Sequence, residues 1–145
     1  MKIGFIGTGI MGAPMAGHLL DAGHEVAVND INPIPQKLLD KGAQAVSSAR
    51  EAAEKGDVII VMVPDTPDVE TVLFGENGVA EGLSPGKIVI DMSSISPVET
   101  KQFAEKINAL DCRYLDAPVS GGEVGAKAAS LTIMVGGSEA AFEKA

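Results

Sequence analysis

Short apolar runs alternate with amphipathic stretches along the whole chain. Apolar or alternating runs predict strands at residues 2–7, 25–30, 44–46, 57–63, 87–92, 113–117 and 131–135. Apolar residues three or four apart predict helices at residues 10–22, 34–41, 48–55, from 66, at 97–110 and from 138. This alternation predicts an α/β fold with a doubly wound, mostly parallel sheet and helices on both faces. Residues 1–145 amount to one domain.

Three of the predicted helices begin with recognisable capping signals. Thr66 is the predicted N-cap of one helix, with Pro67 as its first helical residue. Ser96 and Glu99 have the spacing of a capping box at the start of another. Ser138 is the predicted cap of the last helix, which has only just begun at residue 145. We therefore expect the domain to be truncated within that helix.

The first predicted strand leads directly into a turn of the pattern G-x-G-x-x-G. Glycines there allow a sharp turn, a close approach of the backbone to a ligand, and tight packing of the next helix on the strand. Strand, turn and helix together are typical of a Rossmann-type dinucleotide site, where backbone N–H groups face a pyrophosphate. The predicted pyrophosphate-binding residues are Gly7, Thr8, Gly9, Ile10, Met11 and Gly12. The motif is weak by itself in a chain with 17 glycines, so its flanking elements carry the prediction.

An acidic residue at the end of the second predicted strand completes this pattern. Asn29 and Asp30 end the strand, and both are predicted cofactor-binding residues. Asp30 lies 18 residues after Gly12, close to the roughly 20 expected of a ribose-binding carboxylate. The alternative is that Asp30 only starts the turn before Pro33. A 2′-phosphate would need a nearby arginine, and no basic residue occurs before Lys37. The sequence therefore favours NAD over NADP.

Two more strand ends face the same predicted crevice, because ligands in such sheets bind at the carboxyl ends of the strands. Val63 and Pro64 are candidates for the wall beside the cofactor, although a proline there can simply end the strand. Ser94 is a candidate cofactor contact. The alternative for Ser93 and Ser94 is ordinary entry into the next helix.

Composition and charge exclude several classes of protein. The apolar fraction of 46% argues against disorder, and a net charge of −9 argues against nucleic-acid or anionic membrane partners. The single cysteine, Cys112, cannot form an internal disulfide, which favours a reducing cytoplasm. Two histidines without partner cysteines give no metal-ligand spacing, and no apolar run is long enough to span a bilayer. We expect no metal site.

A serine and two glycines follow the strand predicted at residues 113–117. The hydroxyl of Ser120 and the successive N–H groups of Gly121 and Gly122 can form a nest for a substrate carboxylate, although a plain flexible turn is the alternative. Here the chain resembles the β-hydroxyacid dehydrogenase family. The resemblance covers essentially the whole chain and rests on residues 7–15, 62–67, 72–78, 91–97, 116–122 and 133–137.

The resemblance implies a reaction and a division of roles. Within the family the chain is most similar to members that interconvert tartronate semialdehyde and D-glycerate by hydride transfer with a nicotinamide. The glycine turn would hold the pyrophosphate and Asp30 the ribose. Val63 and Pro64 would flank the cofactor, Ser94 would lie near the nicotinamide, and residues 120–122 would bind a small carboxylate substrate.

The chain departs from the family pattern in two respects. Many members have Gly-Thr-Leu where this chain has Ala129, Ser130 and Leu131, and alanine would be strained if that position needs a positive φ. The family's general acid is a lysine in a second, helical half that also drives homo-oligomerisation, and that half is absent from residues 1–145. Lys127, the only lysine near the predicted substrate loop, is expected to be a solvated surface residue. We therefore expect no catalytic residue in this chain, and little or no turnover.

Other functions are consistent with the same residues. One alternative is a regulatory module that binds a dinucleotide without catalysis, and another is a different member such as 3-hydroxyisobutyrate dehydrogenase. A methyltransferase would have a similar glycine loop but no use for the loop at residues 116–122. The serines at the strand ends favour an oxidoreductase.

Overall fold

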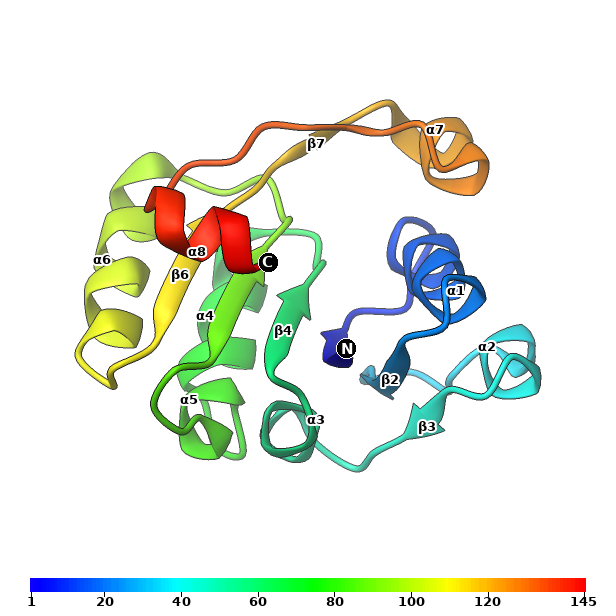
Figure 1. Ribbon diagram of the computed structural model, residues 1–145, viewed down its shortest axis with the longest axis horizontal. Coiled ribbons are helices and arrows are strands. Elements are labelled where there is room, and N and C mark those ends of the chain that lie inside the picture. Colours follow the sequence, from blue (N-terminus) through cyan, green and yellow to red (C-terminus); the bar gives the residue numbers. More distant parts are fainter.

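The computed structural model describes residues 1–145 and has one parallel six-stranded sheet at its centre (Figure 1). The strand order is β3-β2-β1-β4-β5-β6, which is the Rossmann order with its reversal between β1 and β4. The strands are β1 Lys2–Ile6, β2 Glu25–Asn29, β3 Gln44–Ala45, β4 Val58–Val61, β5 Ile88–Asp91 and β6 Arg113–Asp116. The predicted doubly wound α/β fold is confirmed.

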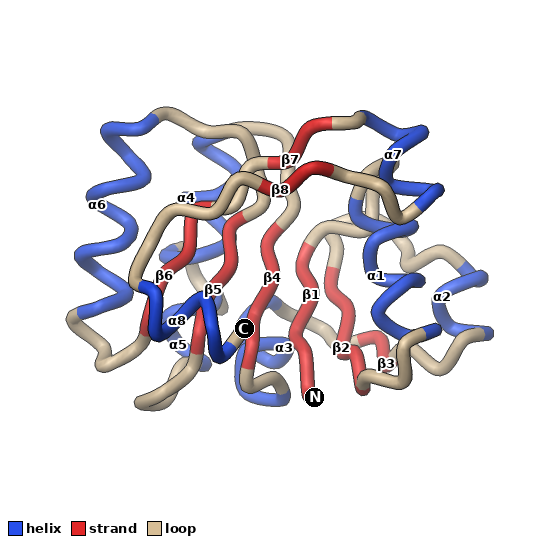
Figure 2. Tube along the Cα trace, turned by 45° about the horizontal axis from the view of Figure 1, so that its top comes forward, coloured by secondary structure: helices blue, strands red, loops and turns tan.

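Helices cover both faces of the sheet. Figure 2 shows the strands between two helical layers. The helices are α1 Gly12–Asp21, α2 Gln36–Asp40, α3 Ala49–Lys55, α4 Thr66–Phe74, α5 Val79–Gly82, α6 Pro97–Asn108, α7 Gly122–Ala128 and α8 Glu139–Lys144. Helices α3 to α6 pack on one face, while α1, α2 and α8 pack on the other.

The face under α3 to α6 is sealed, and we call it the closed face. Its strand residues Ile6, Ile59, Val61 and Val89 are all buried. They form one cluster with apolar residues of the four helices. Alternate strand residues point to opposite faces, so the neighbouring residues Phe5, Ile60 and Ile90 belong to the other side.

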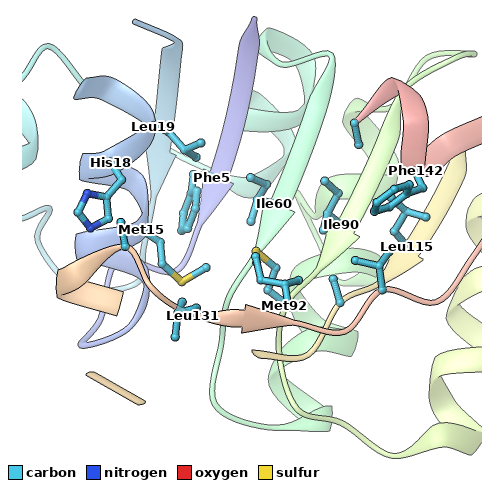
Figure 3. A pocket seen from close by; sticks show the side chains of 15 residues that line it. Phe5, Met15, His18, Leu19, Ile60, Ile90, Met92, Leu115, Leu131 and Phe142 are labelled. Atoms are coloured by element: carbon cyan, nitrogen blue, oxygen red, sulfur yellow. The ribbon is translucent and has the colours of Figure 1, made fainter. Parts of the chain in front are cut away.

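That other side carries a groove of about 360 Å³ between α1 and α8, and we call it the grooved face. Figure 3 shows its floor of strand side chains and the chain of β8 passing across it. Fourteen of its fifteen lining residues are hydrophobic, His18 being the exception. They are Phe5, Met15, Leu19, Ile60, Ile90, Met92, Leu115, Ala117, Ala129, Leu131, Ile133, Val135, Phe142 and Ala145.

The strand predicted at residues 131–135 is wrong in extent, and it lies outside the main sheet. Only β8, Thr132–Ile133, is a strand, and it pairs antiparallel with β7, Val119–Ser120, rather than joining the main sheet. Glycines at 121, 122, 136 and 137 flank this pairing, and three of them have positive φ. Figure 2 shows β7 and β8 crossing above the carboxyl ends of the sheet strands. Residues 119–133, from β7 through α7 to β8, therefore lie over the carboxyl edge of the sheet, and we call them the strap.

Two of the three predicted caps differ in the structure. The N-cap of α4 is Asp65, whose carboxylate accepts the N–H of Thr66 at 2.8 Å. Ser96 makes no side-chain capping bond, and Glu99 keeps a buried oxygen without a hydrogen-bond partner. Thr66 Oγ1 instead accepts the Ser96 N–H at 3.2 Å, so tertiary contact between the two helix starts replaces the local cap. The cap at Ser138 is confirmed.

The short helices α5 and α7 were not predicted, because they begin beside glycines and span four and seven residues. None of the helices has the length and apolar character that crossing a lipid bilayer requires. Cys112 is fully buried just before β6, as expected of a small apolar residue at a strand start.

Candidate functional site

The glycine turn is tight on its protein side and open on its outer side. Gly7 has φ +104°, and a Cβ there would collide with the carbonyl oxygen of Met62. A Cβ on Gly12 would collide with the carbonyl oxygen of Gly7, whereas one on Gly9 would meet nothing within 4 Å. Only glycine fits the two inner positions, and the open space at Gly9 lets a ligand approach the backbone.

This turn also offers unpaired hydrogen-bond donors. The backbone N–H groups of residues 9–12 donate to no acceptor in the chain. The N-cap of α1, Met11, provides no side-chain cap either. Ile10 is exposed, Met11 is half-buried and Thr8 is buried beneath the turn. Unpaired N–H groups at the start of a ten-residue helix fit an anion such as a pyrophosphate.

The carboxylate of Asp30 lies against this turn. Its Oδ2 accepts the backbone N–H of Thr8 at 2.7 Å, and the Thr8 hydroxyl lies 3.4 Å away. Its Oδ1 accepts the N–H of Asn32 at 2.8 Å. Asp30 therefore forms the predicted local turn and also reaches the glycine loop. A carboxylate has about four acceptor positions, so half-buried Asp30 keeps capacity for ribose hydroxyls.

Asp30 forms no salt bridge. Ile31 is fully exposed, and residues 31–36 carry no basic side chain. The amide of Asn29 donates to the carbonyl of Val46 at 3.2 Å, which ties β2 to the chain beyond β3. Asn29 is thus engaged within the protein, and Asp30 is the group left to face a ligand.

The two serines after β5 have different environments. Ser93 is buried, and its hydroxyl accepts the backbone N–H of Val63 at 3.0 Å. Ser94 is exposed. Val63 is half-buried and Pro64 is exposed, directly after β4. Ser93 is therefore a structural residue, while Ser94, Val63 and Pro64 remain accessible at the carboxyl edge of the sheet.

Residues 120–122 lie in the strap above this edge (Figure 2). Ser120 ends β7 and is exposed, and Gly121 and Gly122 have φ +130° and +59° at the start of α7. The Nε2–H of His18 donates to the carbonyls of Ala126 at 2.8 Å and Lys127 at 3.1 Å. The strap is thereby anchored to α1 at the end of α7 that is distant from the glycines.

Lys127 is engaged on the surface of α7. Its ammonium forms an ion pair with Glu123 at 2.8 Å, one helical turn earlier, and both side chains are largely exposed. This is the environment of an ordinary solvated helix pair. The structure gives Lys127 no proton-donor geometry toward residues 120–122.

Comparison with known proteins identifies this fold and turn. Residues 2–145 match the family described as the NAD binding domain of 6-phosphogluconate dehydrogenase. The chain is 58% identical over 144 residues to the 2-hydroxy-3-oxopropionate reductase of Escherichia coli, covering 99% of the chain and 49% of the relative. It belongs to the β-hydroxyacid dehydrogenase family.

Other members are also similar to this NAD-binding domain. Identity is 40% over 144 residues with the mitochondrial 3-hydroxyisobutyrate dehydrogenase of Bos taurus, covering 99% of the chain and 43% of the relative. The solved 3-hydroxyisobutyrate dehydrogenase of Mycobacterium tuberculosis with L-serine has a TM-score of 0.88 at 36% identity, covering 98% of the chain and 48% of that structure. The chain spans about half the length of the curated relatives it matches.

Asp91, at the end of β5, is a charged residue to which the sequence predictions assigned no role of its own. It is fully buried, and its Oδ2 accepts the hydroxyl of Tyr114 at 2.6 Å. Burial raises the pKa of Asp91, while hydrogen bonds from Tyr114 and Ser93 act in the opposite direction. Burial also raises the pKa of Asp116, and the nearby charge of Asp91 adds to this. An acidic residue ending an otherwise apolar strand was the available signal.

Proposed function

We propose that this chain is the coenzyme-binding half of an NAD(H)-dependent oxidoreductase that interconverts tartronate semialdehyde and D-glycerate. The observation that carries the coenzyme assignment is the open glycine turn with the Asp30 carboxylate bonded to its backbone at 2.7 Å. The substrate assignment is supported by 58% identity to the 2-hydroxy-3-oxopropionate reductase of Escherichia coli. The coenzyme, when bound, supplies or accepts the hydride.

The chain's own residues bind and orient the dinucleotide in this proposal. The unpaired N–H groups of residues 9–12 bind the pyrophosphate. Asp30 accepts hydrogen bonds from the ribose hydroxyls and repels a 2′-phosphate, because no basic residue is there to neutralise it. Val63, Pro64 and Ser94 border the nicotinamide, and Ser94 is the one polar side chain among them.

The substrate is a small carboxylate held by the strap. In this proposal Gly121 and Gly122, both at positive φ, donate their successive N–H groups to the carboxylate, together with the hydroxyl of the exposed Ser120. With a net charge of −9, the chain attracts an anion only through such a local site. A proton donor to the carbonyl oxygen must lie within hydrogen-bond reach, and Lys127 is instead paired with Glu123. We therefore expect residues 1–145 to bind coenzyme without reducing the substrate at an enzymatic rate.

Calorimetric titration with NADH and NADPH tests the coenzyme assignment. We expect NADH to bind at least about tenfold more tightly than NADPH, a difference of about 1.4 kcal/mol. Asp30→Ala should reduce that preference, because it removes both the ribose acceptor and the charge that repels a 2′-phosphate. Gln36→Ala, on the exposed start of α2, is the control and should leave both affinities unchanged. Tighter binding of NADPH by the unaltered chain would contradict the assignment.

A second substrate, 3-hydroxyisobutyrate, is supported by the similarity to the bovine and mycobacterial dehydrogenases. The two hydroxyacids, D-glycerate and 3-hydroxyisobutyrate, can be compared in a longer protein that includes the proposed second half, by following the formation of NADH from saturating NAD+. We expect the higher kcat/KM for D-glycerate. A higher value for 3-hydroxyisobutyrate would reassign the substrate without affecting the coenzyme site.

A further inference from the structure

A fully buried carboxylate, Asp91, ends strand β5 at the carboxyl edge of the sheet, where the dinucleotide is proposed to bind. Asp91 lies on the closed face, beside β4, where its Cα partner is Val61. A charge in such surroundings requires compensating hydrogen bonds. The hydroxyl of Tyr114 donates to Oδ2 at 2.6 Å and the backbone N–H of Ser93 donates to Oδ1 at 3.0 Å. Asp91 is therefore held from both β6 and the loop that follows β5.

The same loop is linked to the end of β4. The Ser93 side chain is buried, and its Oγ accepts the N–H of Val63 at 3.0 Å. This is the only acceptor for that N–H in the chain. Pro64 follows and has no N–H of its own. The hydrogen bond from the Val63 N–H to the Ser93 hydroxyl is therefore the last one that fixes the backbone after β4, before the exposed loop begins.

Hydrogen bonds thus connect Tyr114, Asp91, Ser93 and Val63 across three strands. The adenosine side of the site has a separate set, from Asp30 to Thr8 and Asn32. No side chain belongs to both sets. The two halves of a bound dinucleotide would therefore depend on different residues.

We propose that Asp91, acting through Ser93, is a positioning residue that fixes Val63 and Pro64 as the wall beside the nicotinamide half of the coenzyme. This inference rests on the proposed coenzyme site. Asp91 touches neither coenzyme nor substrate in it. Its carboxylate orients the Ser93 loop, and the Ser93 hydroxyl sets the direction of the Val63 backbone. The adenosine diphosphate half is bound independently of this chain of contacts.

Titration with NADH and with ADP-ribose, which lacks the nicotinamide, separates these roles. We expect Ser93→Ala to weaken NADH binding about five- to tenfold, since one buried hydrogen bond is lost, and to leave ADP-ribose binding within about twofold of the unaltered chain. Asp91→Ala should behave like Ser93→Ala. Asp91→Asn keeps an oxygen for the Ser93 N–H and should restore most of the NADH affinity.

Cys112→Ala is the matched control for lost stability. Cys112 is fully buried, yet it precedes β6 at the opposite edge of the sheet, where its thiol contacts the carbonyl of Ser84 at 3.1 Å. Cys112→Ala should leave the affinities for NADH and ADP-ribose unchanged.

Equal weakening of NADH and ADP-ribose binding by Ser93→Ala, or no weakening of either, would overturn the positioning role. So would equal affinity of the unaltered chain for the two ligands. Failure of the unaltered chain to bind either one would instead refute the coenzyme site itself, and the positioning role with it.

Discussion

The two faces of the sheet carry the same kinds of apolar side chain, but helices cover them to different degrees. On the closed face Ile59 is fully buried beneath α3 to α6. On the grooved face the strap residue Ile133 is 47% exposed, and α8 ends beside Phe142, which is 55% exposed. Figure 3 shows Phe142 on one side of the groove that lies between α1 and α8.

The difference lies in the covering helices and not in the strands. Helices α3 to α6 belong to one hydrophobic cluster on the closed face, whereas α1 and α2 belong to one cluster on the other face and α8 to another. Strand β4 is apolar at every position, so its sequence does not distinguish the faces. Burial of a strand residue is thus decided by elements distant in the chain. Truncating a side chain that lies beneath the helices should consequently cost more stability than truncating one in the exposed part of the grooved face.

Truncating matched isoleucines on the two faces should give the largest contrast. Ile59→Ala removes a fully buried side chain and should cost about 2–5 kcal/mol in the free energy of unfolding. Ile133→Ala, in the half-open strap, should cost less than about 1 kcal/mol. Urea unfolding followed by circular dichroism measures both. Similar losses for the two variants would show that the grooved face is sealed in solution.

The buried polar contact on the closed face should give the next largest effect. Tyr114→Phe leaves the Asp91 Oδ2 without its donor at 2.6 Å and should cost about 1.5–3 kcal/mol, the range for hydrogen bonds to charged groups. His18→Ala removes the bond to Ala126 on the grooved side, where the imidazole is half-exposed, and should cost about 0.5–1.5 kcal/mol. Urea unfolding measures the loss of stability in both variants. A larger loss for His18→Ala than for Tyr114→Phe would show that the polar contact on the grooved side contributes more.

The pH dependence of stability should also come from the closed face. Burial raises the pKa of Asp91 in the folded protein, so the folded state binds more protons than the unfolded state at pH values above about 3.9. Stability due to Asp91 is complete below that value and is lost as pH rises through the folded pKa. The slope from one such group is at most about 1.4 kcal/mol per pH unit.

Asp91→Asn should remove this slope. The measurement is the difference in the free energy of unfolding between the unaltered chain and the variant, taken across this pH range. Subtraction cancels the shared groups that do not interact with Asp91. Asp116, whose pKa is also raised by burial, acts with the same sign, so a second substitution, Asp116→Asn, should flatten the curve further. A difference that is constant, or that grows in favour of the unaltered chain as pH rises, would contradict this assignment.

The main sheet and the glycine turn were predictable because their signals are local. The apolar run at residues 57–63 contains the buried strand β4. Asp30, predicted from its spacing to Gly12, contacts the glycine turn through the N–H of Thr8. The strap was not predictable. Strands β7 and β8 pair over only two residues each, and this pairing depends on the glycine turns beside it and on the isolated β-bridge between Asp116 and Gly136. The roles of Ser93 and Asp91 were missed for a similar reason. Their partners, Val63 and Tyr114, lie 30 and 23 residues away.

The smallest effect should come from Ala129, a residue of the groove wall with backbone strain. The family resemblance suggested glycine there, and the structure has Ala129 as the C-cap of α7 at φ +55° and ψ +38°, in the left-handed region. That conformation costs about 1–2 kcal/mol for an alanine. Replacement by glycine also loosens the unfolded chain, which offsets about 0.4–1 kcal/mol of the gain. Ala129→Gly should therefore stabilise the domain by up to about 1.6 kcal/mol. The adjacent Ala128→Gly lies inside α7 and should destabilise the domain by about 0.5–1 kcal/mol.

Differential scanning calorimetry of the Ala129→Gly and Ala128→Gly variants should give melting temperatures shifted in opposite directions. Shifts of the same sign would mean that the end of α7 does not hold the left-handed conformation in solution.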